Sequence, residues 1–430
     1  MKKISKVLAI MLVLSMFLTA CAGSTGSSSN DSGDIILRFS WWGGDERHEK
    51  TLEAIALFEE QNPGIKIEPE YSGWQGHLEK ITTQIVGNTA ADIMQINWNW
   101  IYSFSRDGNG FYDLSTLDAI DLSNYEDFLL EQTTVDGKVN ALPVGIGGKV
   151  FYYNQTTYDK AGVEIPQTFE DLFVAAPIFK EKLGNDYYPI DLDQYGAFLM
   201  VLYYLEQKTG KPFIVDNEVA YTQAELEDGY NFYMEMVDKG VTPSMQVRAG
   251  AGDVAVDQTP SWIQGKYGGT YEWDSAVNKF LAALEGDQTM VTGEFLNDIG
   301  PHQSALNKVS MTFAINKNTK YPEAAAKFLN FLVSDPEATR ILGTSRGIPA
   351  NKAAEEVLLE EGLLSGLNYE GNVKVQEFAG KGISPYFEAD ELNSFFRAVV
   401  EELGFGIIDA STAAAKTISE TNRLLAELAQ

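Results

Sequence analysis

The sequence predicts an α/β fold built on a parallel sheet and divided into more than one domain. Residues 35–40 alternate as a strand, a helix pattern follows from about Glu46, and residues 65–68 form a second strand. Such a strand–helix–strand unit implies parallel pairing. The chain has 430 residues, of which 44% are hydrophobic, so it has material for two or three domains.

The remaining elements are predicted from periodicity and from Gly and Pro stops. A helix with Leu78, Ile81 and Ile85 on one face precedes a strand over residues 92–96. Further strands are expected at residues 139–143, 149–154 and 309–315, and helices at 169–183, 194–208, 223–239, 323–334, 336–342 and 389–430. The glycine-rich residues 145–148 are interpreted as a crossover between domains, with a plain loop as the alternative.

The charge and the Cys and His content exclude several function classes. The net charge is −29 and no Lys/Arg-rich run exists, which argues against a nucleic-acid partner. One cysteine and three histidines provide neither a disulfide framework nor a zinc site, so we expect no metal and no cofactor.

The N-terminus has the pattern of a targeting segment. Three lysines precede an apolar stretch over residues 7–18, as in a secretory signal. Residues 18–21, Leu-Thr-Ala-Cys, resemble the lipobox of bacterial lipoproteins; the alternative is an ordinary signal peptide with a chance cysteine. We therefore expect a signal peptide at 1–20, lipidation of Cys21, a flexible tether at 21–33 and an extracytoplasmic protein, lipid-anchored to the bacterial cell membrane.

Tryptophans follow three successive strands of the predicted sheet. They are Trp41 and Trp42, then Trp74, then Trp98 and Trp100. Ligands bind outside the carboxyl ends of strands in open parallel sheets, so these ends predict a binding site, unless the indoles pack the core. Alternation with Ile35, Leu37 and Phe39 makes Trp41 the core residue and Trp42 the ligand-facing one.

A later aromatic stretch resembles the first in composition. Residues 261–274 contain Trp262, Tyr271, Trp273 and Asp274 around a glycine-flanked strand. They are candidates for the opposite side of a cleft, with burial beneath a helix as the alternative.

No catalytic constellation is recognisable in the sequence. Residues 343–347 match G-x-S-x-G, but the nucleophile elbow needs a preceding strand and here a helix is predicted. The glycines near Lys149 lack the remaining P-loop positions, and no carboxylate pair has glycosidase spacing. We predict no catalytic residue.

With these segments in view, the whole chain resembles the extracellular solute-binding lipoproteins of carbohydrate ABC importers, the class that includes maltose-binding protein. The resemblance is carried by the Cys21 motif, LRFSWWGG, ADIMQIN, WIQGKYGGTYEWD, the stretch from MTFAIN to ATRIL, and RGIPANK. The WWGG and NWNW segments are most similar to oligosaccharide-binding members, including a pectic oligogalacturonide type.

The resemblance implies a two-lobe periplasmic-binding-protein (Venus-flytrap) fold with hinge crossings. Lobe I would be 34–142 plus 305–345, and lobe II 143–304 plus 346–430. By position, the first lobe would contribute Trp42, Gly43, Gly44, Asp45, Arg47, Trp74, Asn97, Trp98, Asn99 and Trp100 to the ligand site. Lobe II or the hinges would contribute Trp262, Tyr271, Trp273, Asp274 and Arg346.

The function implied is capture of an oligosaccharide and its delivery to an ABC permease whose ATPase lies on another chain, by a protein expected to be monomeric. Indoles suit the C–H face of a sugar ring, and amide, carboxylate and guanidinium groups suit its hydroxyls. Because Arg and Lys are few in the aromatic segments and the chain is acidic, a neutral or mixed oligosaccharide is favoured over oligogalacturonide.

Two other functions remain as alternatives. A surface glycosidase or polysaccharide lyase would also use an aromatic cleft, and a glycan-binding adhesin or structural lipoprotein would need no transport partner. Turnover of a glycan separates the first from a binding protein, and a glycan stability screen separates the second.

Overall fold

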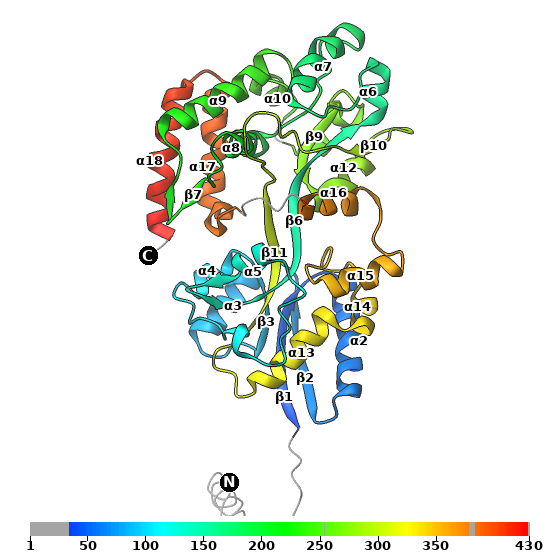
Figure 1. Cartoon of the computed structure of the whole chain (residues 1–430), viewed down its shortest axis with the longest axis vertical. Helices are drawn as coiled ribbons and strands as arrows, with labels where there is room; N and C mark the ends of the chain where they lie inside the picture. Colours follow the sequence, from blue (N-terminus) through cyan, green and yellow to red (C-terminus); the bar gives the residue numbers. More distant parts are fainter. Residues whose placement is uncertain (1–33, 253, 378–382, 429–430) are drawn as a thin grey trace, which may run out of the picture. The chain divides into compact units, whose positions relative to one another are not determined.

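A computed structural model describes residues 34–252, 254–377 and 383–428 (Figure 1). The chain divides into two compact units, Met1–Asp34 and Ile35–Gln430, and every described helix and strand belongs to the second. The predicted signal peptide, Cys21 and the tether lie outside the described residues.

A parallel β–α–β–α–β segment begins the fold, as the sequence predicted. Its elements are β1 (Ile35–Trp42), α2 (Asp45–Gln61), β2 (Ile65–Ser72), α3 (His77–Val86) and β3 (Ile93–Asn97). β1 pairs in parallel with β2 from Ile35↔Ile65 to Trp42↔Ser72, and with β3 at Phe39↔Ile93. The carboxyl ends of three strands are therefore adjacent.

Two long strands extend this sheet on its other side. β11 (Asn307–Ile315) pairs antiparallel with β3 and with the first half of β6 (Leu142–Asn154). The second half of β6 pairs with β9 (Gly269–Trp273) and β10 (Met290–Thr292), which gives the order β10-β6-β11-β3-β1-β2 with β9 on β6. Gly145, Gly147 and Gly148 lie within β6, where its partner changes.

Short elements and loops connect β3 to β6. They are α4 (Trp100–Phe104), η1 (Leu114–Thr116), α5 (Asp127–Glu131), β4 (Thr134–Val135) and β5 (Lys138–Val139).

A layer of helices surrounds the buried helix α8 (Gln194–Thr209). Helices α9 (Gln223–Asp238) and α17 (Asp390–Gly404) contact α8, and α18 (Ala410–Leu428) extends the layer by packing on α9 and α17. The remaining elements here are α6 (Gln155–Ala161), α7 (Phe169–Lys182), β7 (Ile214–Val215), β8 (Glu218–Val219), α10 (Met245–Gly250), η2 (Val256–Gln258), α11 (Pro260–Ile263), η3 (Asp274–Ala276), α12 (Val277–Ala283), α16 (Gly366–Glu377) and η4 (Pro385–Glu388).

Three helices after β11 return to the N-terminal part of the sheet. α14 (Pro336–Leu342) packs on α2, and α13 (Pro322–Ser334) contacts both α2 and α14. α15 (Lys352–Glu360) packs on α13 and α14, although the sequence analysis placed residues from 346 onward in the second lobe.

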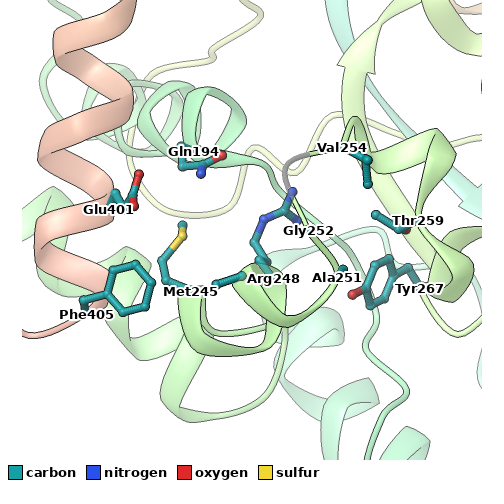
Figure 2. A pocket seen from close by; sticks show the side chains of 11 residues that line it. Gln194, Met245, Arg248, Ala251, Gly252, Val254, Thr259, Tyr267, Glu401 and Phe405 are labelled. Carbon is teal, nitrogen blue, oxygen red and sulfur yellow. The ribbon is translucent and has the colours of Figure 1, made fainter.

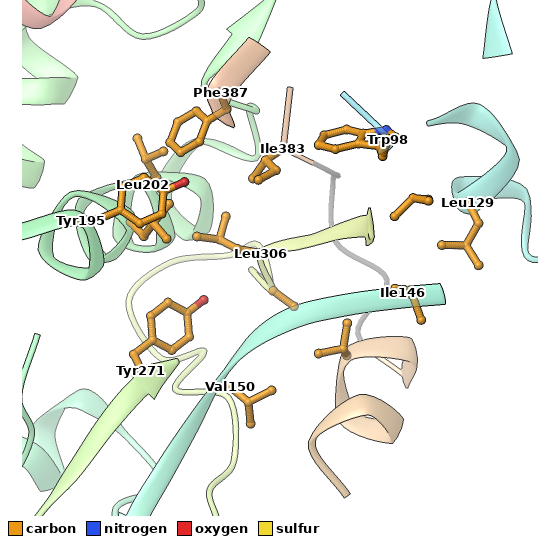
Figure 3. Packing of buried hydrophobic residues seen from close by; sticks show 14 of the residues in the cluster. Trp98, Leu129, Ile146, Val150, Tyr195, Leu202, Tyr271, Leu306, Ile383 and Phe387 are labelled. Atoms are coloured by element: carbon orange, nitrogen blue, oxygen red, sulfur yellow. The ribbon is translucent and has the colours of Figure 1, made fainter. Parts of the chain in front are cut away.

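The buried core continues across β6 and β11. Figure 3 shows Trp98 and Leu129 from the first part of the chain close to Ile146 of β6, and Leu306 close to the residues of the later helices. All belong to one hydrophobic cluster. In the part of the chain that is described, no helix has the length and apolarity to cross a membrane.

Candidate ligand-binding site

Three indoles gather at the carboxyl ends of β1, β2 and β3. The ring centroids of Trp74 and Trp100 are 5.4 Å apart with an interplanar angle of 18°, and Trp42 lies 5.2 Å and 5.4 Å from them. Trp74 is 56% exposed, whereas Trp42 and Trp100 are 6% and 5% exposed. Trp74 is thus the accessible member of this aromatic cluster. Trp42, expected to face the ligand, and Trp100, expected to line the site, are instead buried rings that support it.

Trp41 points to the opposite face, as strand alternation predicted. It is fully buried, stacks on Phe39 at 4.9 Å and donates from Nε1 to Nδ1 of His48. The structure therefore confirms Trp41 as a core residue.

His77 packs beneath the aromatic cluster and was missed by the sequence analysis. Its ring is 5.3 Å from that of Trp42, and its Nδ1 is 2.8 Å from Oγ of Ser72. Burial, with a smaller contribution from Lys80, lowers the pKa of His77 to about 4. The imidazole is neutral at pH 7, so the base of the cluster is uncharged.

Two arginines flank the carbonyl group of Trp42. Arg47 donates from Nη1 to this carbonyl (3.1 Å) and from Nε to the carbonyl of Ser345 (2.9 Å). Gln95 also donates to the Trp42 carbonyl (3.3 Å) and accepts from Nε of Arg346 (2.9 Å). The two arginines, predicted separately, thus belong to one network.

Neither guanidinium is neutralised within this network. Arg346 also donates to Oγ1 of Thr51 (2.9 Å), and its guanidinium lies 5.5 Å from the centroid of the Phe313 ring. Among the described residues, the hydrogen-bond partners of the two guanidinium groups are carbonyl, amide or hydroxyl oxygens. Burial and then the charge of Arg47 lower the pKa of Arg346 to about 9, which leaves it cationic at neutral pH. Two partly desolvated cations without a carboxylate form a local anion-attracting centre.

The glycines before α2 make room for this arrangement. A Cβ on Gly43 would lie 2.6 Å from Cδ of Arg47, whereas one on Gly44 would contact nothing within 4 Å. Gly44 caps α2, and Asp45 is an exposed residue of its first turn. Only Gly43 is therefore required by packing.

The segment after β3 contains polar groups and one buried indole. Asn97 donates to Oδ1 of Asn99 (2.6 Å), and both side chains are partly exposed. Trp98 is 1% exposed and donates from Nε1 to the carbonyl of Gln132 (2.9 Å). Trp98 thus packs in the hydrophobic core, and it also lines one side of a pocket with Tyr102, Ile214 and Tyr386.

Two of the later aromatic residues are also core residues rather than site residues. Trp262 has no exposed surface, donates to the carbonyl of Phe280 (2.9 Å) and meets its ring edge-on at 5.0 Å. Tyr271 is 1% exposed and lies 4.6 Å from Phe151. Both face inward from segments that the sequence analysis placed at a cleft, so for these two residues the alternative of burial is the one observed.

Trp273 is the partly exposed aromatic at the end of β9. Two ammonium groups lie over its ring, Lys308 at 4.6 Å and Lys149 at 5.4 Å from the centroid. Lys149 pairs with Glu272 (2.7 Å), and Lys308 pairs with Glu388. Lys308 and Glu388 were not predicted, because they lie 35 and 115 positions after Trp273 in other elements and form no local pattern with it.

Asp274 lies behind this aromatic and is 2% exposed. Its carboxylate accepts from Nδ2 of Asn372 (2.7 Å) and from the amide of Ser275 (2.7 Å). Burial, partly offset by these hydrogen bonds, raises the pKa of Asp274 to about 6. Its side chain connects η3 with α16 and has little surface for a ligand.

An ion pair near Lys149 was also missed. Arg397 of α17 donates to Asp193, the N-cap of α8 (2.9 Å), and its guanidinium lies 5.3 Å from the ring of Tyr195. Burial would raise the pKa of Asp193, but Lys149 and Arg397 more than offset this effect and lower it. The charges around Trp273 and α8 are therefore coupled.

The chain belongs to the family of bacterial extracellular solute-binding proteins, which it matches over residues 44–339. A solved periplasmic oligogalacturonide-binding protein from Yersinia enterocolitica is 34% identical, with a TM-score of 0.86; the match covers 92% of this chain and 100% of that one. A de novo designed cysteine esterase is also 34% identical, with a TM-score of 0.88 and coverage of 92% and 99%.

Curated relatives extend the comparison to sugar transport. A maltooligosaccharide ABC transporter solute-binding lipoprotein from Streptococcus pneumoniae is 24% identical over 372 residues, which are 82% of this chain and 81% of that protein. The chain spans only about half (53%) of the first curated relatives it matches, at 27% identity. The fold is thus the two-lobe periplasmic-binding-protein fold that the sequence predicted.

Proposed function

We propose that this chain is the substrate-binding protein of a carbohydrate ABC importer and that Trp74 carries the first sugar ring. The observation that carries this proposal is the exposed indole of Trp74 supported by Trp42 and Trp100. Packing of an aromatic face contributes about 0.5–1.5 kcal/mol beyond area burial. The sugar-binding relatives of similar fold support the same function.

The second face of the site would be Trp273 with its two lysines. Asp45, Asn97 and Asn99 would pair with hydroxyl groups on the first side. Ligand contact with both sides would stabilise a closed state by hinge motion about β6 and β11, the strands shared by the two halves of the sheet. We place the boundary of the first lobe after α15, because that helix packs on α13 and α14.

The ligand that we propose is acidic, in contrast to the neutral oligosaccharide favoured by composition alone. Arg47 and Arg346 are cationic, partly or fully buried and not paired with a carboxylate. The chain's net charge of −29 acts mainly at long range, and salt screens it beyond about 8–10 Å. The nearby pair Arg47 and Arg346 therefore determines which ligand charge the site prefers. The Yersinia enterocolitica protein, which binds oligogalacturonide, is consistent with a uronate.

The remaining parts of the function follow from the family. We propose that a separate ABC permease with its own ATPase receives the ligand, that the protein is monomeric, and that a lipid on Cys21 holds it at the membrane. We propose no enzymatic activity.

Isothermal titration calorimetry with digalacturonic acid and with maltotriose tests the proposed binding function. Chromatography of the glycan recovered after each titration tests whether it has been cleaved. We expect tight binding of the acidic disaccharide, weaker binding of maltotriose and intact glycan afterwards. Cleavage of either glycan would refute a pure binding function, and a preference for maltotriose would refute the acidic ligand. If the protein binds neither of these glycans and no member of an oligosaccharide panel, the proposed role in sugar transport is refuted.

A further inference from the structure

Tyr71 is a second exposed aromatic residue at the end of β2, three positions before Trp74. It is 46% exposed, and among the described residues the other exposed aromatic side chains are Trp74, Tyr321 and Phe405. Two of these four rings therefore lie within four consecutive positions at the carboxyl end of β2, the edge of a parallel sheet at which ligands bind.

Other rings support Tyr71 on its inner side, as two buried rings support Trp74. The ring centroid of Tyr71 lies 5.0 Å from that of Trp41 and 4.5 Å from that of His48. Nε1 of Trp41 donates to Nδ1 of His48 across 3.1 Å, and because an indole N–H can only donate, this bond requires the neutral imidazole. The ring of Tyr71 thus rests on a bonded pair of rings, and its exposed area is available for contact.

The surface between the two exposed rings is formed by backbone. β1 continues toward α2 because the amide of Gly43 donates to the carbonyl of Ser72 (3.0 Å). In the parallel ladder Tyr71 pairs with the core tryptophan of β1, whereas Trp74 contacts the tryptophan on the opposite face of that strand. Gly43 and Gly44 carry no side chain, and Gly44 is exposed, so a saccharide chain can cross the end of β1 from one ring to the other.

Positive charge reaches the imidazole that supports Tyr71. Burial has the largest effect on the pKa of His48 and lowers it; Asp45 raises this pKa, and the charges of Arg47 and Arg346 lower it. Among the described residues, neither arginine is hydrogen-bonded to a carboxylate.

The arginine of another pocket differs in this respect. Figure 2 shows Arg248 in a pocket between α10 and α17, where it forms an ion pair with the buried Asp191. Its charge is therefore compensated within the protein. The uncompensated positive charge lies instead near His48, on the Tyr71 side of the sheet edge.

We propose that Tyr71 is a further ligand-contact residue and that its exposed ring face binds a third sugar ring of the oligosaccharide held at Trp74. This inference rests on the function proposed above. A tyrosine ring provides an apolar face for the C–H side of a sugar, and its hydroxyl group can bond to the hydroxyl groups of the sugar.

Calorimetry with digalacturonic acid and trigalacturonic acid tests this contact, because the third ring is the one assigned to Tyr71. In the parent chain we expect the trimer to bind about three- to tenfold more tightly than the dimer, the range that one aromatic contact provides. Tyr71→Ala should reduce the affinity for the trimer to about that for the dimer. Tyr71→Phe, which keeps the ring, should retain most of the difference.

Tyr321→Ala is the matched control, because this tyrosine is 42% exposed and lies at the N-cap of α13. We expect it to bind both ligands as the parent chain does, and urea denaturation of each variant separates lost contact from lost folding. If Tyr71→Ala keeps the preference for the trimer, or weakens both ligands equally, the inference is overturned while dimer binding by the parent chain still supports the transport function. A parent chain without this preference overturns it as well, and a parent chain that binds neither ligand refutes the acidic ligand together with this inference.

Discussion

Nε of Arg346 donates to Oε1 of Gln95 across 2.9 Å, and the same glutamine donates to the carbonyl of Trp42. Gln95 is fully buried in β3, so it fixes a cation from a distant loop beside the end of β1. The positive charge and the indole that precedes α2 are thereby held together by one polar side chain.

Removal of either positive charge should change ligand selectivity. We expect Arg346→Gln and Arg47→Gln to weaken digalacturonic acid binding about ten- to hundredfold, because a charged hydrogen bond contributes about 1.5–3 kcal/mol. Maltotriose binding should change much less. Calorimetry on both ligands measures the difference, with Arg340→Gln, an exposed arginine paired with Glu361, as the control. Equal losses for both ligands would show that the arginines act on structure rather than on charge.

Alanine substitutions of Gly43 and Gly44, the two adjacent glycines before α2, form a matched pair of variants. Gly43→Ala introduces a Cβ 2.6 Å from Cδ of Arg47, so the side chain must move and its bond to the Ser345 carbonyl is lost. Gly44→Ala has free space. We expect about tenfold weaker digalacturonic acid binding only in the first variant. Similar affinity in the two variants would contradict a role for the position of Arg47.

Substitutions in the aromatic cluster should affect ligand binding and the free energy of unfolding to different extents. Trp74→Ala removes an indole that is 56% exposed, so we expect loss of binding with less than about 1 kcal/mol lost from the free energy of unfolding. Trp42→Ala, at a position 6% exposed, should cost about 3–5 kcal/mol as well. Urea denaturation alongside calorimetry checks both; unimpaired ligand binding by Trp74→Ala would contradict its role.

Two buried groups should give opposite dependences of stability on pH. The folded-state pKa of His77 is lowered to about 4, below its ordinary 6.5, so the unfolded chain binds more protons between these values and stability falls as pH drops from about 6.5 to 4. The pKa of Asp274 is raised to about 6 from 3.8, so the folded chain binds the additional proton and stability rises as pH drops through 6.

Variants at these positions isolate each contribution. Between pH 7 and pH 5, His77→Gln should lose less unfolding free energy than the parent chain, by about 1–2 kcal/mol, because each pKa unit corresponds to about 1.4 kcal/mol. Asp274→Asn should lose more than the parent. Urea denaturation at both pH values measures the differences, and the same slope in all three proteins would contradict the assigned burial.

The strand ends were predictable because they depend on local pattern. Alternation placed Trp41 in the core and Trp42 on the other face, and the parallel β1–α2–β2 unit brought Trp74 beside Trp42. The roles of Trp98, Trp262 and Tyr271 were not predictable. Each lies in a glycine- or asparagine-containing segment next to real site candidates, yet its ring turns into the core, and only tertiary packing decides that direction.

The sequence by itself determined the α/β class, the order of the N-terminal elements and the convergence of tryptophans at one sheet edge, because these follow from short-range periodicity. Only the tertiary structure decided that Arg47 and Arg346, 299 residues apart, share a network through Gln95, and that Lys308 lies over Trp273. The reason is physical: desolvation, ion pairing and ring contact depend on distances between residues remote in the chain, which no local pattern encodes.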